Sequence, residues 1–331
     1  MGSIISSEAI NEAMFSNYLQ SKHFRKIITK KSDLVYYIPT IYKSIQDHSN
    51  IAVIQLPLKK SGNNDKIITQ INYYKSNPHK NIINIVEFSE KTLKTSLFTS
   101  KKEISILAEY HFYTLLNNLE SLARKGLFYD ESEIWYILIS LIKALYYLKT
   151  NSAYHSNIKL DTITITSDGE LKIFPNHLFG KQASGFYQMK NYLTKDYDYC
   201  YLSPELLKYL DQNTKIKRSW KHDIFSIGIL AVELCTLKNA KCCFDFEKLL
   251  LDHEKIRAFL ENIQENYSMS LAKIIGKLLN YEKIDDDFLN EILNDIERME
   301  FNYSIRISPN LLNSLKNSAK FTIEEVENPN E

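Results

Sequence analysis

One segment limits what this chain can fold into: "KHDIFSIGILAVELCTL", residues 221–237. At helical spacing its apolar residues occur on nearly every side, so a helix formed here cannot lie at a surface. The segment therefore predicts a helix buried in the middle of a helical domain. A second apolar segment, "IWYILISLIKALYYL" (134–148), contains Lys143 and is too short to span a bilayer, so it also predicts a buried helix.

The first third of the chain has a different pattern. The runs "LVYYIPTIY" (34–42) and "NIAVIQLPL" (50–58) are rich in β-branched and aromatic residues, which predicts antiparallel strands. Helical spacing predicts a helix at 65–76, and two or three further strands are expected between 81 and 110.

From residue 111 the pattern becomes mostly helical, and Gly126 is predicted to end one of the helices. Alternating residues around Asp168-Gly169 predict a hairpin at 162–174. The chain is therefore expected to be an α+β protein. A small antiparallel β-rich N-terminal part with one main helix would precede a larger α-helical C-terminal part.

Charge is balanced, with 41 Lys and Arg residues against 40 Asp and Glu residues and a formal net charge of +1. Such a chain has no overall basic field, so nucleic acid is not expected as a partner. The four cysteines lack the paired spacing of a zinc site, so no metal site is expected. Free thiols and the lack of an apolar signal core within residues 1–20 both favour the cytoplasm.

The N-terminus carries a short lipidation pattern. "MGSIIS" fits N-myristoylation at Gly2, and the basic segment 22–31 would supply a second, electrostatic attachment signal. The protein would then be peripheral on a membrane surface. The alternative is an unmodified terminus followed by an ordinary solvent-exposed basic face.

Six short motifs resemble those of the eukaryotic protein kinase family, in the family's order, across residues 20–315. They are "HKNIINIVEF" (79–88), "ILAEY" (106–110), "HSNIKLDT" (155–162), "SPE" (203–205), "DIFSIG" (223–228) and "IRIS" (305–308). The resemblance implies a bilobal kinase-like fold. It divides the chain into an N-terminal segment (1–20), an N-lobe (21–110), a C-lobe (111–315) and a tail (316–331).

The N-lobe positions that hold nucleotide phosphates in the family have lost their chemistry. No glycine occurs between Gly2 and Gly62, so the family's glycine-rich loop cannot form in its usual way. The strand lysine falls at Ile54, or at Gln55 after a shift of one residue, and its glutamate partner falls at Gln70. All of these side chains are uncharged.

The C-lobe shows the same loss. Asn157 stands for the catalytic aspartate, and an amide cannot accept the proton of a substrate hydroxyl. Thr162 and Pro175 stand for the two metal-binding residues, while Lys159 is retained. The resemblance therefore implies no bound metal. ATP, if it binds, is expected to bind weakly and without magnesium, through hinge residues Ala108, Glu109, Tyr110 and His111.

Residues with architectural roles in the family persist. Asp223 is expected to accept hydrogen bonds from the catalytic-loop backbone near His155, and Glu205 is expected to pair with Arg306. The resemblance thus implies a pseudokinase that binds other proteins, an active kinase among them, as a scaffold or allosteric regulator. The alternatives are an atypical active Ser/Thr kinase that uses Lys159, and a membrane-attached adaptor.

Overall fold

The computed structural model divides the chain into two compact units, Met1–His111 and Phe112–Glu331. The structure describes residues 15–21, 24–29, 40–46, 49–57, 64–94, 100–175, 178, 200–212 and 219–303. Gly2 and Arg306 lie outside these residues, as do parts of the basic segment 22–31. Within the described ranges, no helix has both the length and the apolar character to cross a membrane.

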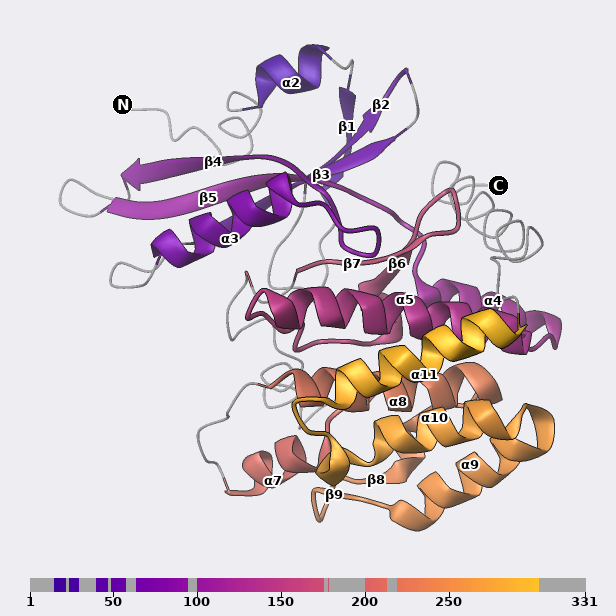
Figure 1. The fold of residues 1–331 in the computed structure, drawn as a ribbon. Coiled ribbons are helices and arrows are strands. Elements are labelled where there is room, and N and C mark those ends of the chain that lie inside the picture. The colour runs from indigo at the N-terminus through magenta and orange to yellow at the C-terminus, as the bar shows by residue number, and fades with distance from the viewer. Residues whose placement is uncertain are drawn as a thin grey trace. The chain divides into compact units, whose positions relative to one another are not determined.

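The first unit contains a five-stranded antiparallel sheet with the strand order β1-β2-β3-β5-β4 (Figure 1). Its strands are β1 (Phe24–Thr29), β2 (Thr40–Ser44), β3 (Asn50–Pro57), β4 (Ile85–Lys94) and β5 (Ser100–Glu109). Strand β1 was not predicted, because the charge of segment 22–31 suggested a solvent-exposed basic face. Arg25 and Lys26 are indeed exposed, but they belong to an edge strand paired with β2.

A short helix, α2 (Ser16–Ser21), completes the core of this sheet. Phe15 and Leu19 are buried in a cluster with Ile51 and Val53 of β3 and Leu107 of β5. The sequence had placed residues 1–20 outside the small domain. Part of that segment instead covers the sheet, because two apolar side chains spaced by four residues can be buried together on one side of a helix.

Helix α3 (Asn64–Ser76) forms where helical spacing predicted it and packs along β4 (Figure 1). It buries Ile71 and Tyr74. At its last turn, Lys75 Nζ lies 2.6 Å from Glu87 Oε1 of β4, which holds the pKa of Glu87 below its ordinary value.

The second unit is mainly helical. Its helices are α4 (Leu115–Lys125), α5 (Glu131–Thr150), α7 (Pro204–Gln212), α8 (Trp220–Thr236), α9 (His253–Asn266), α10 (Met269–Leu279) and α11 (Phe288–Tyr303). Its hairpins pair β6 (Ile163–Ile165) with β7 (Leu171–Ile173) and β8 (Phe244–Asp245) with β9 (Leu250–Leu251). Short 3-10 turns are η1 (Leu160–Thr162), η3 (Ala240–Cys243) and η4 (Tyr281–Lys283). The predicted helix end at Gly126 is confirmed by its left-handed φ of 65°.

Helix α8 is buried along nearly its whole length and contacts α5, α9 and α10, as its apolar pattern predicted. Helix α10 packs tightly against α8 at Gly228. A Cβ atom at this position would lie 2.9 Å from Leu279 Cδ2 and 3.1 Å from Leu278 Cβ. Gly228 is therefore the residue that lets the two helices pack at this distance.

Candidate functional site

Strand β3 places the position of the family's strand lysine in an apolar environment. Ala52 and Ile54 share one face of the strand, since side chains alternate. They pair with Ala108 and Ile106 of β5, and Ile54 is only 4 % exposed. Gln55 belongs to the other face, which favours Ile54 as the counterpart of the lysine. No charge can be supplied from this position.

The helix that would carry the partner glutamate is also neutral at the matching position, where Gln70 is half-buried. Among the described residues, Lys75 and Glu87 form an ion pair between α3 and the sheet, and their side chains are 35 % and 47 % exposed. This pair connects the last turn of α3 with β4. It therefore joins α3 to the sheet without involving Ile54 or Gln70.

The expected hinge residues lie at the end of β5, where local hydrogen bonds fix the backbone. Glu109 N–H donates to Asn84 O at 3.0 Å, and Asn84 N–H donates to Glu109 Oε1 at 2.7 Å. Tyr110 N–H donates to Asn50 O at 2.9 Å. The Glu109 carboxylate also lies 3.6 Å from His111 Nε2. The carboxylate of Glu109 therefore binds groups of its own unit, beside the end of β5.

In the helical unit, Asp223 at the start of α8 holds the catalytic loop. Its two carboxylate oxygens accept hydrogen bonds from the backbone N–H groups of His155 at 2.8 Å and Ser156 at 2.7 Å. Asp223 and His155 are each 1 % exposed. Ser156 takes a left-handed φ of 62°, which turns both N–H groups of the loop toward one carboxylate. This is the contact that the kinase resemblance implied for Asp223.

Other polar groups of the loop, from Asn157 to Thr162, bind one another. Thr162 Oγ1 lies 2.8 Å from Asn157 O and 2.9 Å from Lys159 O, and it accepts the Lys159 N–H at 3.2 Å. The Lys159 ammonium lies 2.7 Å from Asp161 Oδ2. These two side chains are 11 % and 31 % exposed. Lys159 is thus paired within the loop, and Thr162 is turned toward the loop's own carbonyls.

The position of the family's main metal-binding carboxylate follows β7. Pro175 is buried there and accepts the N–H of Leu178 at its carbonyl, at 3.1 Å. A proline side chain offers no metal ligand. In the part of the chain that the structure describes, no cluster of three His, Cys, Asp or Glu side chains could hold a metal ion.

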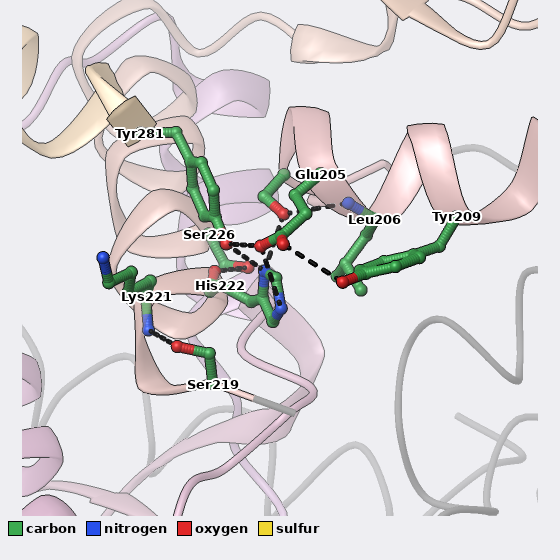
Figure 2. A network of polar contacts seen from close by, with 9 residues as sticks. Glu205, Leu206, Tyr209, Ser219, Lys221, His222, Ser226 and Tyr281 are labelled. Atoms are coloured by element: carbon green, nitrogen blue, oxygen red, sulfur yellow. Dashed lines mark hydrogen bonds and ion pairs between the residues drawn. The ribbon is translucent and has the colours of Figure 1, made fainter. Parts of the chain in front are cut away.

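Glu205 of α7 lies in a polar network with α8 and η4 (Figure 2). Its carboxylate accepts hydrogen bonds from Tyr281 Oη and, at 3.2 Å, from Tyr209 Oη. His222 Nε2 lies 3.9 Å from the same carboxylate. The predicted partner, Arg306, lies outside the described residues. The two tyrosines carry no motif, so the sequence did not indicate them.

This network also resembles a serine–histidine–carboxylate triad. Ser203 Oγ lies 2.8 Å from His222 Nδ1, and the other ring nitrogen faces Glu205. Ser203 is fully buried, however, so its hydroxyl cannot reach a substrate. The arrangement therefore joins α7 to α8 and η4 and has no nucleophilic role.

A second buried carboxylate, Glu233, lies in the middle of the helical unit. It accepts hydrogen bonds from Tyr201 Oη and, at 2.9 Å, from Ala240 N–H. Burial raises the pKa of Glu233 to about 7, and the two hydrogen bonds only partly oppose that shift. Sequence analysis missed this residue. The signal was present, since Glu233 is an isolated carboxylate within an apolar helix.

Comparison with known proteins gives the family. Residues 39–294 match the family described as protein kinase domain. Among curated proteins, the chain is 27 % identical over 173 residues to the serine/threonine-protein kinase Nek1 of Mus musculus, which covers 52 % of this chain and 13 % of that protein. It is 22 % identical over 184 residues to PAK 5 of Rattus norvegicus, covering 56 % and 23 %, and 25 % identical over 194 residues to pakC of Dictyostelium discoideum, covering 58 % and 36 %.

The match thus spans well under two thirds of each of these relatives. The family match, residues 39–294, is shorter than the range 20–315 over which the motifs resemble the family, and Arg306 lies beyond that match. Within it lie the sheet of β2 to β5, the catalytic loop, and helices α7 to α10. Because the match covers more than half of the chain and agrees with the α+β architecture, this protein belongs to the protein kinase domain family.

Proposed function

We propose that this chain is a catalytically inactive member of the protein kinase family that acts by binding other proteins, as a scaffold or allosteric regulator. The observation that carries the proposal is that polar side chains of the catalytic loop bind other groups of the same loop. Lys159 is neutralised by Asp161, and the hydroxyl of Thr162 binds the loop backbone. Both groups therefore already have partners within the loop.

The chemistry of phosphoryl transfer supports the same proposal. The reaction depends on positioning the phosphates and neutralising their charge rather than on covalent catalysis. Ile54 and Gln70 supply no charge, and Asn157 and Pro175 supply no carboxylate. A charge-assisted contact contributes roughly 1.5–3 kcal/mol, so the joint loss of several weakens triphosphate binding by orders of magnitude.

The alternative is an active Ser/Thr kinase with a rebuilt ATP site, as the names of the relatives suggest for those proteins. It would need Lys159 to leave Asp161 and contact a phosphate instead. A displaced lysine, Lys59 or Lys60, would have to replace the strand lysine. Both lie outside the described residues.

The deciding experiment is a thermal shift with millimolar ATP, measured with and without magnesium, together with labelled-phosphate transfer. We expect no magnesium-dependent stabilisation and no transfer above the Lys159→Ala variant. Lys248→Ala is a matched control, because Lys248 is an exposed lysine on the β8–β9 hairpin. Transfer that Lys159→Ala abolishes and Lys248→Ala leaves intact would establish the rebuilt site and refute the proposal.

A further inference from the structure

The turn η3 carries two adjacent cysteines that differ in exposure. Cys242 is exposed, whereas Cys243 is buried, as are Cys200 and Cys235. The Cys243 thiol forms a hydrogen bond with the Cys242 thiol, so the two sulfur atoms lie side by side. Cys242 and Cys243 are called the thiol pair below. The pair offers solvent one sulfur atom directly and a second sulfur atom next to it.

The backbone around the thiol pair is held at both ends of the turn. At its start, Ala240 N–H donates to Glu233 Oε1 of α8 at 2.9 Å. At its end, the carbonyl of Cys243 accepts the Asp252 N–H at 2.7 Å. Because these bonds already fix the turn, a ligand that binds both sulfur atoms has to order little of the chain, and this favours affinity.

Charged groups of both signs lie beside the thiol pair. Lys255 Nζ is 2.9 Å from Cys242 O and 3.3 Å from Asp252 Oδ2, so this lysine is paired. Along the chain, the nearest charged residues are Lys241 before the pair and Asp245 after it. The charges therefore balance, and they favour neither an anionic nor a cationic ligand. The chemistry of the site lies in its sulfur atoms.

The buried sulfur is a protonated thiol at neutral pH. Burial raises the pKa of Cys243 to about 12, and the neighbouring Cys242 thiol and Asp252 carboxylate act in the same direction, while Lys255 opposes them. A thiol of this kind is a poor nucleophile, because the thiolate is the reactive form. A bound metal or metalloid ion nevertheless displaces the proton, since thiols that coordinate such an ion are deprotonated.

The two sulfur atoms are better suited to bind one ion between them than to bond to each other. Adjacent Cα atoms are about 3.8 Å apart across a trans peptide, whereas disulfides usually join Cα atoms about 4.4–6.8 Å apart. A direct disulfide would therefore require the turn to distort. An ion between the sulfur atoms lengthens the bridge and removes that requirement.

The number of available ligands restricts the ion. Soft thiolate ligands select soft ions such as monovalent copper. A structural zinc ion needs four ligands, and within the described residues no group of three His, Cys, Asp or Glu side chains could hold a metal ion. The spacing of the cysteines argues against zinc in the same way. What fits the thiol pair is an ion that needs only two sulfur ligands.

We propose that the thiol pair binds a soft, thiophilic ion through Cys242 and Cys243 alone, of the class of monovalent copper and trivalent arsenic. When an organoarsenic oxide binds, two S–H bonds break and two As–S bonds form. Its oxygen leaves as water with both protons, so no electrons are transferred. Cys242 meets the ion first because it is exposed, and the adjacent Cys243 completes the chelate. The inference goes beyond the proposed function and does not depend on loss of catalysis.

The test uses the full chain and phenylarsine oxide, whose arsenic atom takes two thiolates. Native mass spectrometry should show one arsenical per chain, retained in excess glutathione, which has a single thiol, and released by the dithiol dithiothreitol. Cys242→Ser and Cys243→Ala should each weaken this retention by about a hundredfold or more, because a single As–S bond lacks the gain of chelation. Cys235→Ala is the matched control, since it also removes one buried thiol.

Several results would overturn the inference. Because Cys242 is exposed, Cys242→Ser keeps the fold, and retention by this folded variant would place the arsenical elsewhere. Equal loss in Cys235→Ala, or no retention by the parent chain, would also refute the thiol pair. Zinc binding that both pair variants abolish would refute the two-ligand assignment.

The outcome for the thiol pair is separate from the outcome for catalysis. Phosphate transfer by a chain that retains the arsenical would refute the inactive-kinase proposal and leave the thiol pair standing.

Discussion

The catalytic loop and the matching positions on β3 and α3 differ in the charges that they carry. In the loop, charged groups remain. Asp223 accepts hydrogen bonds from two backbone amides and Lys159 pairs with Asp161 Oδ2, while Asp161 Oδ1 is buried without a hydrogen-bond partner. At Ile54 and Gln70 the charges are gone. Among the described residues, an ion pair between α3 and β4 is Lys75–Glu87, whose side chains are 35 % and 47 % exposed.

The difference follows from what each charge has to satisfy. The N–H groups of the loop are buried whether or not a nucleotide binds, so the carboxylate of Asp223 remains necessary. If a buried lysine and glutamate are needed only for a ligand, a change of one of them alone leaves the other as an unpaired buried charge. Neutral side chains at both positions avoid that cost.

The comparison is tested most strongly by removing the carboxylate of Asp223, which should have the largest effect on stability. Asp223→Ala leaves two buried N–H groups without an acceptor, so the free energy of unfolding should fall by about 3–5 kcal/mol. Urea denaturation followed by circular dichroism measures it. Glu261→Ala, an exposed change on α9, should stay within about 0.5 kcal/mol. If Asp223→Ala lowers the free energy of unfolding no more than this control does, the loop is held in place without the carboxylate of Asp223.

The next largest effect concerns pH and Glu233. Its pKa is raised from 4.5 to about 7, so the folded state favours the protonated carboxyl group. This contribution to stability is complete below pH 4.5 and is lost as pH rises through 7. Between pH 5 and pH 8 the free energy of unfolding should fall by about 2.5 kcal/mol more in the parent than in Glu233→Gln. Parallel pH profiles of the two proteins would contradict the shift.

A smaller effect distinguishes the partners of Glu205. A double-mutant cycle of Glu205→Gln with Tyr281→Phe should give a coupling of about 1 kcal/mol, reduced because the Glu205 side chain is 39 % exposed. A second cycle with Arg306→Gln measures the pair that the sequence predicted, for which a buried geometry gives about 3–5 kcal/mol. Zero coupling to Tyr281 would mean that the network seen in Figure 2 adds no stability.

The smallest effect is expected at Lys75–Glu87. The pair is more than a third exposed, so a cycle with Lys75→Gln and Glu87→Gln should give about 0.5 kcal/mol, less at high salt. The pKa of Glu87 is lowered chiefly by its hydrogen bond with Lys75, so this contribution disappears as pH falls below 4.5. A coupling of several kcal/mol would mean that the pair replaces the buried ion pair of the family.

Local rules predicted the elements whose signals lie within a few residues. Gly126 at a helix end and Gly169 in the hairpin both take the left-handed φ that their positions required. The all-apolar pattern of α8 correctly predicted its central place. Helix α2 and strand β1 were missed because α2 owes its stability to a sheet formed much later in the chain, and β1 carries surface charge that concealed its pairing with β2.

The candidate site was predictable only where a motif carried it. The positions of Asn157, Lys159 and Asp223 followed from spacing, whereas the pairing of Lys159 with Asp161 depends on side-chain direction within the loop. The partners of Glu205 could not be found in this way. Tyr281 lies 76 residues away, and a tyrosine hydroxyl that donates to a carboxylate needs no fixed sequence context.

The hydroxyl of Thr162 has an evolutionary consequence. It now ties together the carbonyls of Asn157 and Lys159. Replacing it with the asparagine of the family would exchange this hydroxyl for a larger amide, while a metal ion would still lack its other ligand at Pro175. A single substitution therefore disturbs the contacts of the loop without restoring the metal site. If catalysis has been lost as proposed, selection acting on one substitution at a time cannot easily restore it in this loop.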